Sequence, residues 1–383
     1  MDQLKLRGIG QIQAADLAFG DLTVLIGPQA TGKSIALQFL KLVTDAGYVQ
    51  NELARYGLDW SGKLAEFFDI YFGEGMRSLW NPAESSVEWN GKLIDIPKLA
   101  SRKRKTTNES LFLIPAQRVL TLREGWPRPF TDYSSGDPFA VRAFSEKLRN
   151  LSEKEFGSTE NLFPQKNRLK SEIRELLESS IFRDFRLQID KSRVQKRLVL
   201  GTSEHPLPYM VWSAGQREFV PLLLGLYWLL PPSKVARRDQ LKWVVIEELE
   251  MGLHPQAITA VLMIVLELLS RGYRVCLSTH SSQVLECVWA LQFLKSNGGK
   301  PKEVLELFGV RKTASTLGIA QDSLKKVFKV FYFDTSGTTR DISSLDSDSD
   351  ETTESEWGGL AEFGSRANRV VAQAIQDHRS FSE

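Results

Sequence analysis

The first residues with evident chemistry form a glycine-bounded loop that ends in a lysine and a serine. A buried strand is predicted before this loop at residues 22–26, and an apolar helix after it from Ile35 to Val43, ending at Gly47. Glycines allow backbone N–H groups to point at phosphate oxygens, and the start of a helix adds a positive partial charge. The predicted phosphate-binding residues are Gly27, Pro28, Gln29, Ala30, Thr31, Gly32, Lys33 and Ser34.

Within this loop, Lys33 is expected to reach the β- and γ-phosphates of a nucleotide, and Ser34 to ligate Mg²⁺. A turn that contains glycine could match the pattern by chance. The preceding strand, the following helix and all four fixed positions agree, so the sequence favours a nucleotide site. The loop alone does not say which class of nucleotide enzyme this is, and the downstream motifs must decide.

Three further apolar strands are predicted at residues 111–114, 243–248 and 274–280, and each ends in polar residues. Because strands and helices alternate, we expect an α/β fold with a mixed, mainly parallel sheet, preceded by short antiparallel strands. The carboxyl ends of parallel strands meet at one edge of the sheet. The polar residues expected at that edge are Gln117, Glu247, Glu248 and His280.

A second helix start carries a different signal. Ser213 is followed three residues later by Gln216, which is the spacing of a capping box, with Gly215 between them. The simple interpretation is a serine that caps a helix. The functional interpretation is a helix start whose free N–H groups bind an anion.

The composition is that of an ordinary globular chain, with 383 residues, 42% of them hydrophobic and 25% charged. The balance of 49 basic and 47 acidic residues gives a net charge of +2, so no global field favours nucleic acid or an acidic membrane. The N-terminus does not resemble a signal peptide, and no run of apolar residues is long enough to span a bilayer. We expect a cytoplasmic protein in which Cys276 and Cys287 are buried thiols.

The chain is predicted to be a single domain, residues 1–383, with insertions between the parts of one sheet. The sheet is expected to come from residues 1–47, 110–120 and 185–335. The other predicted segments are a mixed insert at 48–109 with a hairpin at Asn90-Gly91, a helical hairpin at 138–184, a flexible acidic loop at 341–358 and a C-terminal helix at 364–378 that docks on the body. The basic run Arg102 to Lys105 is interpreted as a solvated loop rather than a nucleic-acid contact.

The chain resembles the head of an ABC-type ATPase in five features that occur in the same order. They are the phosphate loop, Gln117, the Ser213 helix start, Glu247-Glu248 and His280. The stretches Ile246 to Pro255 and Ser278 to Ser282 resemble more narrowly the branch that includes RecF and OLD proteins and ATPase subunits of bacterial anti-phage systems such as PARIS. The resemblance covers the sheet and not the inserts or the acidic tail.

This resemblance implies that the chain binds ATP and Mg²⁺ and hydrolyses ATP. Lys33 and Ser34 would hold phosphates and metal, and Gln117 and Glu247 would support the metal. Glu248 would be the general base and His280 would contact the γ-phosphate. Two residues depart from the family pattern in ways that bear on the rate of ATP hydrolysis. Glu247 replaces the usual aspartate, and Leu249 replaces the usual proline.

The resemblance also implies a partner, because Ser213, Gly215 and Gln216 would reach the nucleotide of a second subunit in a homodimer or higher oligomer. Acidic residues at 346–350 follow no apolar strand, so a fused metal-dependent nuclease is not expected. The function we expect is an ATPase sensor and scaffold that controls a separate effector, a nuclease, in anti-phage defence. The alternatives are a RecF- or SMC-like DNA-binding ATPase of repair or recombination and, less favoured, a nucleotide-bound scaffold without turnover.

Overall fold

A six-stranded sheet forms the centre of the structure, a computed structural model that describes residues 2–101, 108–156, 161–165, 168–191, 195–202, 205–231, 237–238 and 240–380. Its strand order is β16-β15-β3-β14-β13-β6. Five strands are parallel, and β16 runs antiparallel at one edge. The strands are β3 (Leu22–Ile26), β6 (Leu111–Ile114), β13 (Trp243–Ile246), β14 (Arg274–Ser278), β15 (Phe328–Phe333) and β16 (Thr339–Asp341). The predicted α/β class with a mixed sheet is confirmed.

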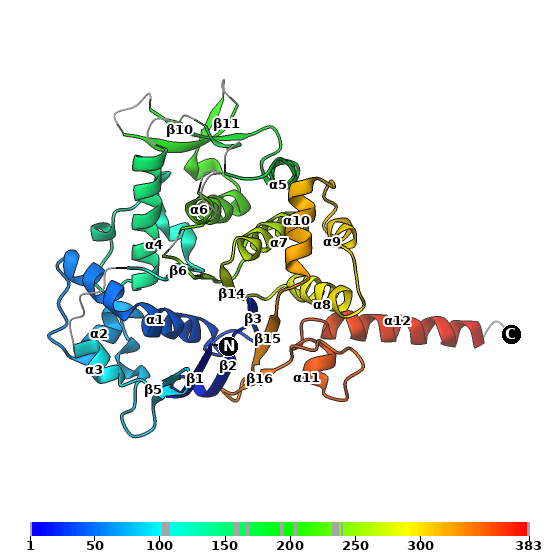
Figure 1. Cartoon of the computed structure of the whole chain (residues 1–383), viewed down its shortest axis with the longest axis horizontal. Coiled ribbons are helices and arrows are strands. Elements are labelled where there is room, and N and C mark those ends of the chain that lie inside the picture. The colour runs from blue at the N-terminus through cyan, green and yellow to red at the C-terminus, as the bar shows by residue number, and fades with distance from the viewer. Residues whose placement is uncertain are drawn as a thin grey trace.

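The sheet separates two hydrophobic cores, because successive side chains of a strand point to opposite faces. In β13, Val244 and Ile246 belong to one core, and Trp243 and Val245 to the other. The first core is covered by α6 (Ala214–Leu229), α7 (Pro255–Ser270) and α8 (Ser282–Ser296). The second core is covered by α1 (Lys33–Arg55) and a small antiparallel sheet (Figure 1).

The small sheet has the order β2-β1-β4-β5 and contains the predicted hairpin at Asn90-Gly91. Its strands are β1 (Gln3–Ile9), β2 (Ile12–Ala18), β4 (Ser86–Trp89) and β5 (Lys92–Leu93). The aromatic residues of the insert pack with α2 (Leu64–Tyr71) and α3 (Ile96–Ser101) in the second core. The basic run Arg102 to Lys105 lies outside the described residues.

Helix α1 differs from its prediction, because it continues through Gly47 to Arg55. Its backbone leaves the helical conformation at Asp45 (φ −127°, ψ 27°). There the Asp45 carboxylate accepts hydrogen bonds from the backbone N–H groups of Ser110 (3.0 Å) and Leu111 (2.9 Å). Gly47 is buried inside the helix, so packing outweighs the low helix propensity of glycine.

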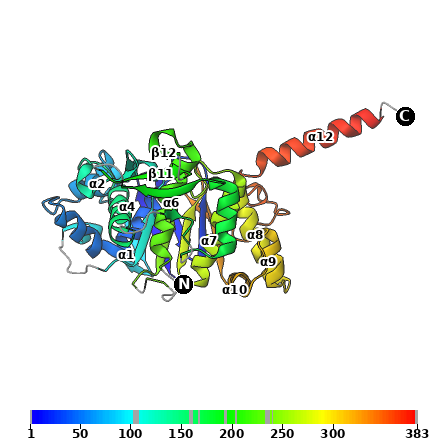
Figure 2. The ribbon, with the colours of Figure 1, turned by 90° about the horizontal axis from the view of Figure 1, so that it is seen from above.

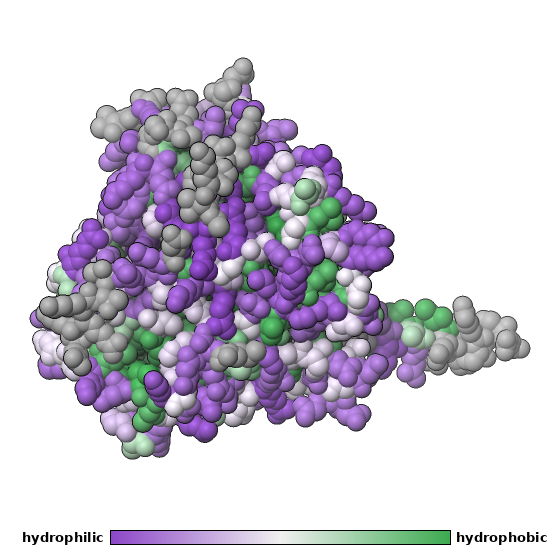
Figure 3. Space-filling model, in the orientation of Figure 1, coloured by the Kyte–Doolittle hydropathy of each residue, from purple (hydrophilic) through white to green (hydrophobic). Residues whose placement is uncertain are grey.

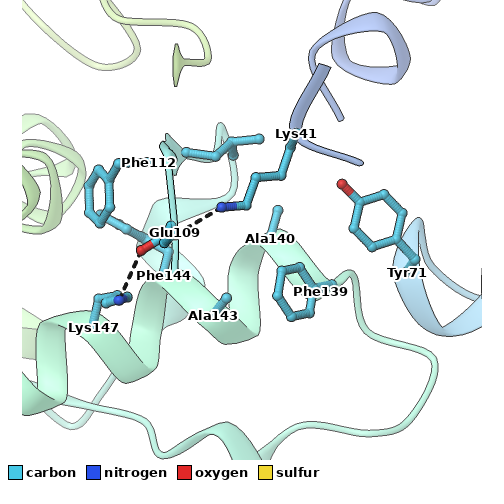
Figure 4. Close-up of a pocket in the computed structure, with 10 residues that line it drawn as sticks. Lys41, Tyr71, Glu109, Phe112, Phe139, Ala140, Ala143, Phe144 and Lys147 are labelled. Atoms are coloured by element: carbon cyan, nitrogen blue, oxygen red, sulfur yellow. Dashed lines mark hydrogen bonds and ion pairs between the residues drawn. The ribbon is translucent and has the colours of Figure 1, made fainter. Parts of the chain in front are cut away.

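A buried ion cluster surrounds this kink. Lys41 donates to Asp45 at 2.7 Å and to Glu109 at 2.9 Å, and Lys147 approaches Glu109 at 2.9 Å. Figure 4 shows Glu109 between the two lysines, beside a small cavity lined by aromatic rings. Burial disfavours the charge on Lys41, but Glu109 and Asp45 outweigh burial and raise its pKa. The cluster ties α1 to the segment before β6 and to α4 (Phe139–Asn150).

The helical hairpin predicted at 138–184 is not present. Helix α4 packs against α6, whereas α5 (Ser171–Leu177) packs against α7, with strand β9 (Asn161–Phe163) between them in the sequence. Each of the two helices buries its apolar side chains against a different helix of the body. Strand β9 joins a second antiparallel sheet, β12-β11-β10-β9, made with β10 (Arg186–Asp190), β11 (Arg197–Gly201) and β12 (Pro206–Pro208).

The C-terminal region differs most from expectation. The segment expected to be a flexible acidic loop holds helix α11 (Thr352–Ser355) and buries Ile342 and Leu345 against the body. The last helix, α12 (Glu362–Ser380), was predicted to dock on the body and instead projects away from it in two perpendicular views (Figures 1 and 2). Its apolar spacing predicted the helix correctly, but spacing does not specify what covers the apolar face. The remaining helices are α9 (Pro301–Leu307) and α10 (Ala314–Ser323).

We predict that Lys41→Met destabilises the fold far more than Lys147→Met. Lys41 is 3% exposed, and its loss leaves two buried carboxylates without their common partner, which costs roughly 3–5 kcal/mol. Lys147 is more exposed and contacts only one of them. Urea unfolding of both variants measures the difference, and equal losses of stability would show that the buried cluster contributes little.

Candidate nucleotide site

The phosphate loop connects β3 to α1, as predicted. Gly27 has a φ of 135°, and a Cβ there would lie 2.3 Å from the Phe333 carbonyl oxygen of β15. Gly32 has a φ of 98° at the start of α1. Neither position accepts another residue without strain, since both lie in the region that favours glycine. The loop residues Pro28, Gln29 and Ala30 are exposed, whereas Thr31, Gly32 and Lys33 are buried.

Lys33 folds back over its own loop. Its ammonium donates to the carbonyl oxygens of Gly27 and Pro28, both at 2.7 Å. Burial lowers the pKa of Lys33 to about 8, although the nearby carboxylates of Glu248 and Glu250 oppose this shift. Lys33 has no ion-pair partner among the described residues. A buried cation at this position is suited to a phosphate, whose charge would compensate the cost of burial.

Glu247 follows β13 and is 2% exposed. Its Oε2 accepts a hydrogen bond from the Ala116 N–H at 3.0 Å, and its Oε1 has no partner among the described residues. Burial raises the pKa of Glu247 to about 7, and the hydrogen bonds from Ala116 and Ser34 act in the opposite direction. The carboxyl is therefore close to Ser34 and has an unused oxygen in a buried position.

Glu248 has an unusual backbone conformation, with φ at 44°. For a residue other than glycine this costs about 1–3 kcal/mol, which the surrounding structure must supply. Its N–H donates to the Ser278 hydroxyl at 3.1 Å, and its carbonyl oxygen accepts from Arg118 at 3.0 Å. Strain of this kind is common at functional positions, and here it fixes the residue predicted to be the general base.

His280 follows β14 and is held by a different carboxylate. The two oxygens of Glu250 accept from the Thr279 hydroxyl, at 2.8 Å, and from the His280 backbone N–H. Glu250 is therefore engaged on both oxygens and is poorly placed to act as a base in place of Glu248. It positions the end of β14 relative to the end of β13.

Arg118, directly after the predicted Gln117, is the residue that connects these loops. Its guanidinium is fully buried and donates to the carbonyl oxygens of Glu247 and Glu248, both at 3.0 Å, and of Glu218 in α6 at 3.2 Å. Gln117 itself is exposed at the end of the segment that follows β6. The end of β13 and the first turns of α6 are thus joined by one side chain.

The capping box at the start of α6 is confirmed. The Ser213 N–H donates to Gln216 Oε1 at 3.0 Å, and the Gln216 N–H donates to Ser213 Oγ at 3.2 Å. Gly215 packs so closely on the loop after β13 that a Cβ would lie 2.7 Å from the Gly252 oxygen. Within the described part of the chain, no hydrogen bond or ion pair joins Ser213, Gly215 or Gln216 to the phosphate loop.

The structure therefore brings most of the predicted residues to one edge of the sheet, and among the described residues the Ser213 group has no hydrogen bond or ion pair to the phosphate loop. Lys33 and Ser34 follow β3, Glu247 and Glu248 follow β13, and His280 follows β14. The lone oxygen of Glu247 beside Ser34 is a fitting ligand position for Mg²⁺, which prefers oxygen ligands. The buried ammonium of Lys33 fits a nucleotide phosphate in the same way.

Sequence reasoning did not identify the structural roles of Arg118 and Glu250. Their roles depend on contacts with residues 29 to 130 positions away. One sequence feature could have indicated the role of Arg118, namely its position directly after Gln117 at the end of a buried strand. A buried arginine needs several hydrogen-bond acceptors, and the backbone carbonyl groups at strand ends supply them.

The strand order and the position of the glycine-bounded loop between β3 and α1 define an α/β fold of the P-loop type. The sequence profile of the family described as "AAA domain, putative AbiEii toxin, Type IV TA system" matches residues 22–286. That is more than half of the chain, and the chain belongs to this family. A search of curated proteins found no significant match.

Several solved structures are similar over most of their length. An SMC head domain from Thermotoga maritima is 14% identical, with 74% of this chain and 90% of that chain covered and a TM-score of 0.30. An Smc head from Pyrococcus furiosus bound to the C-terminal domain of ScpA is 10% identical (89% and 96% covered, TM-score 0.38). The ATP-binding cassette MJ0796, a dimer bound to ADP and Pi, is 10% identical (88% and 97% covered, TM-score 0.36). Identities and scores this low say nothing about function.

We predict that Glu247 makes stability depend on pH in the absence of nucleotide. A carboxyl with a raised pKa stabilises the fold while it is neutral, so this contribution is complete below its ordinary pKa of 4.5 and is lost as pH rises through about 7. Relative to Glu247→Gln, the wild type should lose roughly 2–3 kcal/mol of unfolding free energy between pH 5 and pH 8. Urea titrations at several pH values measure this, and a constant difference between the two proteins would contradict it.

Proposed function

We propose that this chain binds Mg·ATP and hydrolyses it slowly, and that its nucleotide state controls a separately encoded effector, a nuclease, in anti-phage defence. The observation that supports the ATPase part most directly is the convergence of Lys33, Ser34, Glu247 and Glu248 on one edge of the sheet. Phosphoryl transfer depends mainly on charge neutralisation and on an oriented water, and these are the groups that supply both.

In this proposal the chain's own groups bind and orient the substrate. The loop N–H groups and the ammonium of Lys33 hold the phosphates, and Ser34, Gln117 and Glu247 hold Mg²⁺. The metal, when bound, neutralises charge on the phosphate oxygens. Glu248 accepts a proton from the attacking water, and His280 contacts the γ-phosphate. The buried contacts of Arg118 and Glu250 keep Glu248 and His280 in a fixed relation.

The separate position of the Ser213 group supports a role in a second subunit. Ser213 is exposed, and in the part of the chain that the structure describes no carboxylate binds the first N–H groups of α6. In a pair of heads with ATP between them, Ser213, Gly215 and Gln216 of one subunit would face the γ-phosphate held by the other. Arg118 would then link the occupied site to the helix that reaches across.

Control of an effector is supported by composition and by the family. The net charge of +2 gives no general attraction to DNA, and no group of three or more metal-binding side chains occurs in the described part of the chain. The family description names a toxin of a type IV toxin–antitoxin system. A helix long and apolar enough to cross a membrane is also not found among the described residues. Control by nucleotide requires that the effector binds the ATP-bound form of this chain and its other nucleotide states with different affinities.

We predict that Lys33→Ala loses ATP binding and that Glu248→Gln keeps it but stops turnover. The first variant lacks the phosphate-binding cation, and the second has an amide that accepts no proton. Calorimetry measures the affinity, and phosphate release measures the rate. Unchanged affinity in Lys33→Ala would disprove the phosphate-loop assignment, and parental turnover in Glu248→Gln would place the base elsewhere.

For the effector, we predict that the chain co-purifies with the product of a neighbouring gene, and that ATP changes the amount recovered. The chain alone should bind DNA only weakly at physiological salt. The matched control is Glu248→Gln, which should hold the complex in its ATP-bound state. Tight, sequence-independent DNA binding with a steep salt dependence and no partner would favour the RecF- or SMC-like alternative instead.

A further inference from the structure

The carboxylate of Glu218 has no part in the function proposed above, although it lies beside the fully buried guanidinium of Arg118. Glu218 is in the second turn of α6, and its Oε2 is 3.7 Å from Arg118 Nε. The same Nε donates to the Glu218 backbone carbonyl oxygen at 3.2 Å. Glu218 Oε2 is buried and has no hydrogen-bond partner among the described residues. Burial raises the pKa of Glu218, and the charge of Arg118 opposes that shift.

The simple interpretation is that Glu218 only supplies a counter-charge for a buried arginine. A buried pair with that role alone gains most when its charged groups are hydrogen-bonded directly. Glu155 and Arg168 form such a pair at 2.6 Å, and Arg168 also donates to the Tyr227 carbonyl oxygen near the other end of α6. The carboxylate of Glu218 instead stays beyond hydrogen-bond distance of Arg118, so a small displacement of α6 can close this contact or open it further.

A second contact joins the start of α6 to the loop that follows Glu248. A Cβ on Gly215 would lie 2.7 Å from the Gly252 oxygen, and a Cβ on Gly252 would lie 3.1 Å from Glu218 Cγ. The two segments therefore touch at glycine positions, with no side chain between them to absorb a displacement. The loop is joined to the base by Met251, whose N–H donates to the Glu248 carbonyl oxygen at 3.1 Å.

The backbone of Glu248 has little freedom of its own. Its φ of 44° lies in a small region of conformations that are open to residues other than glycine. Its carbonyl oxygen accepts from both Arg118 and Met251, and its N–H donates to the Ser278 hydroxyl. A displacement of the first turns of α6 therefore reaches Glu248 by two routes, through Arg118 and through the loop.

We propose that Glu218 is a positioning residue that, through Arg118, sets the position of Glu248 according to what is bound at the start of α6. This role rests on the proposed function, in which that helix start meets the γ-phosphate held by a second subunit. The phosphate attracts the exposed N–H groups of α6, and the Glu218 carboxylate moves with them relative to Arg118. The base of one head then responds to the nucleotide of the other. This coupling requires that the phosphate binds two positions of α6 with different affinities.

Steady-state kinetics of Glu218→Gln tests the proposal, because the amide has nearly the same shape and no charge. ATP affinity should match that of the wild type, since the phosphate loop is unchanged. The kcat should fall roughly 10–100-fold, because a displacement of about 1 Å from the reactive geometry costs that much. A parental kcat, or a loss of ATP affinity as large as the loss of kcat, would overturn the proposal.

Two further variants separate positioning from charge compensation. Glu218→Asp keeps the charge and shortens the side chain by one methylene, so it should fold like the wild type and still lose kcat. If a counter-charge were the only requirement, its kcat would be parental. The matched control is Glu155→Gln, which removes a carboxylate from Arg168, another buried arginine that contacts α6. It should lower the melting temperature and leave kcat unchanged.

Pairing of the heads tests the same role without turnover. Light scattering compares Glu248→Gln with the double variant Glu218→Gln/Glu248→Gln, each with and without Mg·ATP. Because the Ser213 group is intact in both, ATP should raise the mass of both equally. Apolar side chains on the projecting helix α12 (Figure 3), such as Phe363 at 80% exposure, can cause association without ATP, so only the change made by ATP is counted. Loss of pairing in the double variant alone would show that Glu218 supports the interface and not the base.

Failure of this proposal is distinguishable from failure of the function on which it rests. A wild type that does not hydrolyse ATP would overturn both. An active wild type with a parental kcat in Glu218→Gln, measured beside Glu155→Gln under the same conditions, would overturn only the role of Glu218.

Discussion

The buried guanidinium of Arg118 is the interaction on which the arrangement of the site depends. It binds the carbonyl oxygens of Glu247, Glu248 and Glu218, which come from the end of β13 and from α6. These oxygens would otherwise be buried acceptors, and the arginine would be a buried charge, so each partner needs the other. A single residue thereby fixes the backbone of both acidic residues and the beginning of α6 in one rigid unit.

The parallel sheet is what makes this convergence possible. Strands β3, β14, β13 and β6 are adjacent and in register, so their carboxyl ends lie at one edge. The two cores, one on each face, prevent the strands from shifting, because a shift by one residue would expose a whole set of apolar side chains. Glu247 and Lys33, whose burial shifts their pKa values, both lie at that edge.

The sequence predicted best the elements whose local pattern of apolar and polar residues directly reflects their position in the fold. Continuous apolar runs identified β3, β6 and β13, and the polar residues after them gave the edge of the site. The end of α1 was predicted wrongly at Gly47, because its continuation depends on burial that no local pattern reports. The prediction that α12 docks on the body was wrong for a related reason. The periodicity of apolar residues defines an apolar face of the helix, but it does not say which surface covers that face. The roles of Arg118 and Glu250 were not predicted, because their hydrogen-bond partners are distant in sequence. The roles of the site residues remain predictions.

The contacts of Asp45 have a consequence for how proteins of this architecture can diverge. Asp45 lies where the insert begins, and Ser110 and Leu111, which donate to its carboxylate, lie where it ends. The carboxylate thus joins the two ends of the insert at one point beside β6. A segment closed in this way can become longer or shorter at a small entropic cost, without moving the strands that carry the chemistry. Relatives should therefore differ in the length of this insert more freely than in the residues that close it.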